Sequence, residues 1–188
     1  MILPVYAYGQ PVLKRVATDV DPADPKLEQL LADMWETMYH ANGVGLAAPQ
    51  IGKSQRVFLV DTVQLEEDGN KGDDEPGIKE AFINAHKVEE DGEPWSYEEG
   101  CLSIPHVRGD VERPARITLR YLDGELNEHT RTFTGMNARV IQHEYDHIDG
   151  VLFVDHVKPL KRRLINGKLE KIRKGKVAAD YRMKFAVR

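Results

Sequence analysis

The stretch FTGMNARVIQHEYDHIDG, residues 133–150, carries the periodicity that decides the fold. Four of its residues follow one another at spacings of four, three and four: Met136, Val140, His143 and His147. This spacing places their side chains on one face of an α-helix. The stretch therefore predicts a helix that follows a turn, ends near Gly150 and presents two imidazoles one turn apart.

A second helix is predicted over residues 24–42, where apolar side chains recur at helical spacing. Asp24 is placed to cap it, Pro25 suits its first turn, and Asn42-Gly43 favours an end there. Beyond Pro159 the pattern weakens, and we expect two glycines to interrupt a C-terminal helix: Gly167 and Gly175.

Three stretches rich in β-branched and apolar residues predict strands: residues 55–63, 115–123 and 128–135. Residues 64–80 are acidic and contain glycine and proline, which predicts an exposed loop. We expect an α+β fold in which mostly antiparallel β-sheets pack around the central helix of residues 133–150.

The composition is that of a soluble globular protein, with 41% apolar and 30% charged residues. No apolar run approaches the roughly 18 residues that span a bilayer. Pro4 interrupts the apolar start, which does not resemble a signal peptide, and the single cysteine, Cys101, cannot form an intramolecular disulfide. We therefore expect a cytoplasmic protein that binds neither membranes nor specific DNA sequences.

The charge of the chain is unevenly distributed. From Lys158 onward there are twelve basic residues against Glu170 and Asp180, a net charge of +10, while the body carries −15. The chain is most simply one domain, with residues 1–160 as its body and residues 161–188 as a basic extension. That extension is either solvated or a contact for RNA phosphates.

The helix of residues 133–150 contains an HExxH motif, which predicts a metal site. His143 and His147 can present two imidazole nitrogens to one cation. Glu144 lies about 100° further round the helix, so it is placed to take a proton from water whose pKa the metal has lowered. The alternative is an ordinary amphipathic helix whose histidines lie in the core or at the surface.

A metal site with an open position needs a third protein ligand. A third histidine ten residues after the first is excluded because position 153 is Phe153. Glu170, in the lysine-rich tail, is a poor candidate. Cys101 remains, preceded by Gly100, although a lone cysteine is often a small buried hydrophobic residue.

A third stretch, GVGLAAPQIG, residues 43–52, has both a structural and a functional interpretation. It can be a helix stop and a turn that lead into the strand near Val57. Alternatively, Gly43 and Gly45 let a substrate backbone approach, and Gln50 offers an amide N–H to a developing oxyanion.

Together, GVGLAAPQ, EGCLS and QHEYDH resemble the three signature motifs of the peptide deformylase family, in the family's order. The resemblance extends from about Leu3 to Val157 and includes IDGVLFVDH after the HExxH motif. The chain departs from the family in two places. Where the family often has the sequence INP, this chain has Ile83-Asn84-Ala85, and its acidic loop of residues 64–80 looks longer than is usual in the family.

The resemblance implies roles for individual residues. It implies three metal ligands: Cys101, His143 and His147. It implies Glu144 as the general acid and base, with Gln50 and the backbone N–H of Leu102 as donors to the oxyanion. It implies substrate contacts from six residues: Val44, Gly45, Gly100, Arg108, Met136 and Val140.

The implied reaction is hydrolysis of the formyl group from N-formylmethionyl peptides of nascent proteins, with release of formate. The family typically uses one Fe²⁺ per chain and tolerates Zn²⁺, Ni²⁺ or Co²⁺. In some relatives the C-terminal segment docks on the ribosome, which the basic tail makes a possible partner here.

Three other functions compete with this interpretation. A generic HExxH zinc metallopeptidase needs Glu170 as a ligand and gives no role to the cysteine and glutamine motifs. A cysteine hydrolase uses Cys101 as its nucleophile. A non-enzymatic module that binds RNA through the tail leaves all three motifs unexplained.

Overall fold

The computed structural model describes residues 1–67 and 75–186. Its largest sheet has five antiparallel strands in the order β2 (Gly45–Ala47), β3 (Val57–Asp61), β4 (Lys79–Asp91), β7 (Arg116–Leu122) and β8 (Glu128–Thr134). A separate antiparallel hairpin consists of β5 (Trp95–Cys101) and β6 (Ile104–Arg113). A short parallel pair joins the two ends of the chain, β1 (Val5–Tyr6) and β9 (Met183–Lys184).

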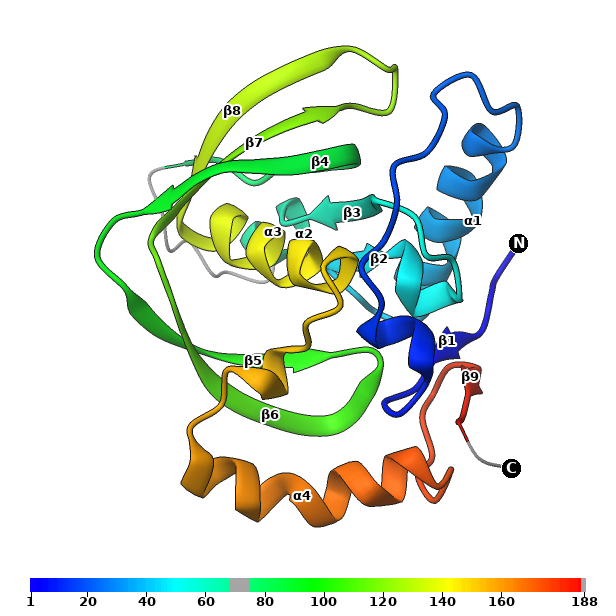
Figure 1. Ribbon diagram of the computed structural model, residues 1–188, viewed down its shortest axis with the longest axis vertical. Coiled ribbons are helices and arrows are strands. Elements are labelled where there is room, and N and C mark those ends of the chain that lie inside the picture. The colour runs from blue at the N-terminus through cyan, green and yellow to red at the C-terminus, as the bar shows by residue number, and fades with distance from the viewer. Residues whose placement is uncertain (68–74, 187–188) are drawn as a thin grey trace.

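Within the described residues, four α-helices accompany these strands: α1 (Leu27–His40), α2 (Val63–Glu67), α3 (Gly135–Ile148) and α4 (Pro159–Arg173). The same part of the chain contains three 3-10 helices: η1 (Pro11–Lys14), η2 (Ala48–Ile51) and η3 (Phe153–Asp155). Helix α3 lies between the five-stranded sheet and the β5–β6 hairpin, and α4 lies on the far side of that hairpin (Figure 1). The predicted α+β architecture around a central helix is confirmed.

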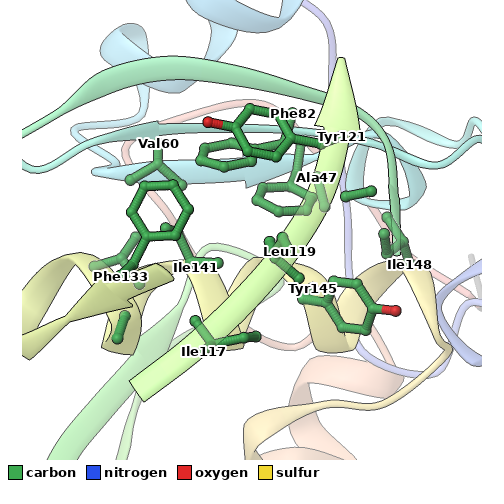
Figure 2. Close-up of a cluster of buried hydrophobic side chains, with 14 of the residues drawn as sticks. Ala47, Val60, Phe82, Ile117, Leu119, Tyr121, Phe133, Ile141, Tyr145 and Ile148 are labelled. Atoms are coloured by element: carbon green, nitrogen blue, oxygen red, sulfur yellow. The ribbon is translucent and has the colours of Figure 1, made fainter. Parts of the chain in front are cut away.

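The helix α3 is central because its apolar face is buried against the large sheet. Ile141 and Ile148 are fully buried there, in one cluster with aromatic side chains from the strands. Figure 2 shows Phe82 and Tyr121 close together on the sheet side of this cluster, and the ring centroid of Phe133 lies 5.7 Å from that of Phe82. Burial of each such side chain stabilises the fold by about 1.5–3 kcal/mol, which fixes the position of the HExxH motif.

The helix α1 starts later than predicted. It begins at Leu27, and Asp24 does not cap it; the Asp24 Oδ1 accepts a hydrogen bond from Lys26 N at 2.9 Å. The carboxylate therefore closes a local turn ahead of the helix, a conformation that Asp often stabilises. The predicted end is confirmed, since Asn42 has φ +56° and Gly43 N bonds to Met38 O at 2.9 Å.

The predicted acidic loop of residues 64–80 is only partly a loop. Its first residues belong to α2 and its last two to β4, while residues 68–74 lie outside the described part of the chain. Glu75 Oε2 accepts hydrogen bonds from Thr134 N at 2.9 Å and Thr134 Oγ1 at 3.0 Å. The end of this segment is thereby tied to the start of α3.

The prediction that Gly167 interrupts the C-terminal helix is wrong. Helix α4 continues through it because Ile165, Leu169 and Ile172 are buried against the hairpin side of the molecule. Their burial, about 1.5–3 kcal/mol each, exceeds the cost of about 1 kcal/mol for one helical glycine. Gly175, at φ +66°, does end the helix, with Gly175 N bonded to Ile172 O at 2.9 Å.

Candidate active site

Three side chains that can bind a metal meet where β5 ends beside α3. The ligand atoms of Cys101, His143 and His147 all lie within 4.8 Å of one another. Cys101 Sγ is 3.4 Å from His147 Nε2. Cys101 is brought there by a register shift between Gly100 and Cys101 at the end of the β5–β6 ladder. One thiolate and two imidazoles suit a transition metal in a catalytic site with an open position.

Glu99 orients one of the two imidazoles. Its Oε2 lies 2.9 Å from His143 Nδ1, which leaves His143 Nε2 to face the cluster. Two arginines hold the same buried carboxylate: Arg113, at 2.7 and 3.1 Å, and Arg139, at 3.1 Å. Burial alone raises the pKa of Glu99, but the hydrogen bonds from His143 and Arg113 outweigh it and hold this pKa below its usual range.

The sequence alone did not identify Glu99, although histidine ligands of metals generally have such a partner. Its adjacency to the EGCLS motif was the available signal. Arg113 also donates to Asp146 Oδ2 at 2.8 Å. Its buried guanidinium group therefore pairs with two carboxylates, that of Glu99 on β5 and that of Asp146 on α3. This network holds the hairpin and the helix together next to the three potential metal ligands.

Glu144 lies on the cavity side of α3 and is 4% exposed. Its Oε2 has no hydrogen-bond partner among the described residues. Burial raises the pKa of Glu144 to about 7, so the carboxyl can take up and release a proton near neutral pH. A Cβ atom at Gly45 would overlap Glu144 Oε1, which explains why β2 carries a glycine opposite this carboxylate.

Gln50 is 1% exposed and its amide is oriented by the backbone. Its Oε1 accepts a hydrogen bond from Ala47 N at 2.9 Å. The Nε2 group therefore points the other way, 3.4 Å from Cys101 Sγ and 3.3 Å from Ser103 Oγ. An amide donor fixed in this manner is suited to stabilising negative charge that develops beside Cys101.

A cavity of about 530 Å³ opens over these groups, within the range of small-ligand sites. It is lined by eleven of the twelve residues predicted for the site: Val44, Gly45, Gln50, Gly100, Cys101, Leu102, Arg108, Met136, Val140, His143 and Glu144. The twelfth, His147, is 1% exposed and does not line the cavity, but it contacts Cys101, which does. Arg108, on the rim, donates to Glu98 Oε2 at 3.1 Å.

The cavity has an apolar and a polar side. Val44 and Met136 pack against the apolar core cluster that contains Val140.

The tail contributes three lining residues that the sequence did not predict: Ala179, Asp180 and Tyr181. No sequence signal was available for them, because contact between the tail and the hairpin depends on tertiary folding.

Glu170 does not belong to the site. It lies on α4 and pairs with Arg173 at 2.8 Å, at the surface. In residues 1–67 and 75–186, the group of Cys101, His143 and His147 is the one set of potential ligands that converges. The ligand required by the metallopeptidase interpretation is therefore absent from this cluster.

Comparison with known proteins agrees with this geometry. The family model described as polypeptide deformylase matches residues 2–163. The chain is 51% identical over 189 residues to the peptide deformylase of Christiangramia forsetii, covering 98% of this chain and 96% of that protein. It is 52% identical over 190 residues to that of Cytophaga hutchinsonii, covering 100% of both.

Solved structures give the same result. A peptide deformylase from Legionella pneumophila superposes with a TM-score of 0.78 at 37% identity, covering 91% of this chain and 95% of that one. One from Synechococcus elongatus, in complex with actinonin, has a TM-score of 0.78 at 37% identity, covering 97% and 92%. This chain belongs to the peptide deformylase family.

Proposed function

We propose that the cavity between β2, the β5–β6 hairpin and α3 is where this chain carries out its family's reaction. That reaction removes the formyl group from N-formylmethionyl peptides and releases formate. The observation that supports this placement is the convergence of three kinds of group on one cavity. These are the Cys101, His143 and His147 cluster, the buried Glu144 carboxylate and the amide of Gln50.

The three clustered side chains are proposed to hold one metal ion. When bound, the ion supplies a Lewis acid and lowers the pKa of water. Fe²⁺ is the ion expected from the family, and Zn²⁺, Ni²⁺ or Co²⁺ are expected to substitute. Glu99 keeps the His143 ring in the orientation that this binding requires, by its hydrogen bond to Nδ1 at 2.9 Å.

Glu144 is proposed to move the proton. It takes a proton from the attacking water and then delivers it to the departing amine nitrogen. Its buried position and a pKa of about 7 make both directions of transfer accessible near neutral pH. Gln50 Nε2 and the backbone N–H of Leu102 donate hydrogen bonds to the oxyanion that forms on the formyl group.

The remaining lining residues are proposed to hold the peptide. Gly45 on β2 and Gly100 on β5 both line the cavity and allow the substrate backbone to approach. Val44, Met136 and Val140 form the apolar side of the cavity and receive the methionine side chain. The exposed Arg108 contacts the peptide at the rim.

The test is formate release from a formyl-Met-Ala-Ser peptide by protein purified without oxygen, with bound metal quantified in the same sample. Cys101→Ala is expected to lose both metal and activity. Glu144→Gln is expected to retain metal and lose activity, which separates ligand loss from proton transfer. Metal binding without formate release by the unmodified protein would contradict the proposed roles.

We also infer that residues 1–160 supply every reacting group and that the basic extension contacts the RNA of the ribosome from the cytoplasm. No helix among the described residues has the length and apolar character needed to cross a membrane. Four basic residues are exposed on α4: Lys161, Arg163, Lys168 and Lys171. Their charge complements phosphates, and such binding weakens with added salt.

Truncation is a poor test of this contact because it removes the buried side chains of α4. Charge reversal at Lys161, Lys168 and Lys171 leaves those side chains in place. We expect it to reduce co-sedimentation with ribosomes, whereas reversal of three exposed basic residues on the body should not: Lys26, Lys53 and Arg120. Equal co-sedimentation of both variants would contradict the inference.

A further inference from the structure

The segment that follows α4 contacts the β5–β6 hairpin and lines part of the active-site cavity. It is anchored beyond the cavity by the β1–β9 pair, in which Val5 N bonds to Arg182 O at 2.9 Å and Ala7 N to Lys184 O at 3.0 Å. In Figure 1 this segment runs from the end of α4 to β9, beside β1. The family model ends at residue 163, so the segment lies beyond the part that the model matches.

Two hydrogen bonds attach residues 178–181, here called the strap, to the turn region of the β5–β6 hairpin. His106 Nε2 donates to Ala178 O at 2.7 Å. The Tyr181 hydroxyl donates to Leu102 O at 2.7 Å. Ala179 and Asp180, between these two points, line the cavity, as does the half-buried Tyr181 itself.

The hydrogen bond from Tyr181 is made to the backbone of the turn that directly follows Cys101. Leu102 lies in the two-residue turn between β5 and β6, directly after Cys101. Turn residues have more conformational freedom than paired strand residues, so their peptide groups need additional contacts to hold one orientation. The Tyr181 hydroxyl supplies such a contact from outside the hairpin, and Tyr8 N supplies another at Ser103 O, at 2.8 Å.

We propose that Tyr181 is a positioning residue for deformylation: its hydroxyl holds the Leu102–Ser103 peptide through the Leu102 carbonyl. This contact restricts the backbone torsions of Leu102 and so keeps the neighbouring Cys101–Leu102 peptide, which carries the Leu102 N–H, aimed at the oxyanion. This rests on the proposed role of that N–H. Loss of a donor to an oxyanion typically costs about 10²–10³ in rate. If the donor is kept but poorly aimed, the rate falls by only part of this factor. Tyr181 acts by keeping the Leu102 N–H aligned with the oxyanion, without touching the substrate.

The test compares Tyr181→Phe with Tyr6→Phe, each loaded with zinc. Both variants remove a hydroxyl that bonds the tail to the body, because Tyr6 Oη accepts from Lys184 Nζ at 3.0 Å. Tyr6 does not line the cavity. For Tyr181→Phe we expect kcat to fall about fivefold with KM within about twofold, as for partial loss of one hydrogen bond in the transition state. For Tyr6→Phe we expect kcat to stay at the wild-type value.

A second measurement reads the position of Leu102 directly. The backbone amide resonance of Leu102 should shift in Tyr181→Phe and not in Tyr6→Phe, with metal content and Tm equal in both. Equal kcat in the two variants, or an unmoved Leu102 resonance, would overturn the proposal. So would a fall in kcat that follows a fall in Tm or metal content, since the role would then be only structural.

The outcome for Tyr181 can be separated from the outcome for the proposed roles. If the unmodified protein releases no formate, the roles assigned to Gln50 and Leu102 fail. The Leu102 resonance still decides, in that case, whether Tyr181 sets the orientation of this turn.

Discussion

Gly45→Ala tests the contact between β2 and the carboxylate of α3. A Cβ atom at Gly45 would lie 2.8 Å from both Cδ and Cγ of Glu144, closer than real Cβ atoms come to other atoms. Glu144 must therefore move by several tenths of an ångström. A misplacement of about 1 Å in a reacting group costs about 10²-fold, so we expect kcat to fall about 10- to 100-fold.

The same substitution overpacks a buried site, which typically costs about 1–3 kcal/mol of folding stability. Denaturant unfolding of Gly45→Ala, at matched metal content, should show this loss. The three atoms nearest to the added methyl, Oε1, Cδ and Cγ of Glu144, are all removed in a Glu144→Ala background, so the additional loss should shrink to less than about 0.5 kcal/mol there.

Gly167→Ala is the matched control. Its Cβ meets nothing within 4 Å, and it lies in the middle of α4. We expect this variant to be more stable by about 0.5–1 kcal/mol and fully active. The reasoning about Gly45 would be refuted if Gly45→Ala kept wild-type kcat, or if its stability loss were the same with and without the Glu144 side chain.

Three further outcomes follow from the structure. Glu99→Gln should weaken metal affinity by about 10- to 100-fold, measured by competition with a chelator, because the ring of His143 loses its charged partner. The same substitution should lower the free energy of unfolding by about 3–5 kcal/mol, because the buried Arg113 and Arg139 lose the negative charge with which they pair. An unchanged free energy of unfolding would contradict this. The His129 hydrogen bond lowers the pKa of Asp123 to about 2, so Asp123 adds stability above its unfolded pKa of 3.8 that is lost as the pH falls towards 2. Unfolding of Asp123→Asn at several pH values should therefore differ from wild type at pH 6 and converge with it near pH 2.

The central helix was predictable because its signal is local and redundant. The spacing of Met136, Val140, His143 and His147 matches one helical periodicity. The apolar residues of another face, Ile141 and Ile148, are buried against the large sheet. The wrong start of α1 had a different origin. Asp24 fits a helix cap and an ordinary turn equally well, and the choice between them depends on the conformation of Lys26, which the residue types do not encode.

The continuity of α4 could not be predicted from its glycine. The decisive quantity is the burial of Ile165, Leu169 and Ile172, and this depends on the hairpin against which they pack. Glu99 and Tyr181 were missed for a related reason. Each acts through a contact between segments that are far apart in the sequence. Glu99 is 44 residues from His143, and Tyr181 is 79 residues from Leu102.

The parallel pair between β1 and β9 has a consequence for the order in which the molecule is assembled. During synthesis Val5 is made before its partner Met183, which is added 178 residues later. A growing chain can build the large sheet and insert α3 well before this pair exists. The strap at residues 178–181 is anchored by that pair, so this side of the cavity is completed only after Met183 has been added.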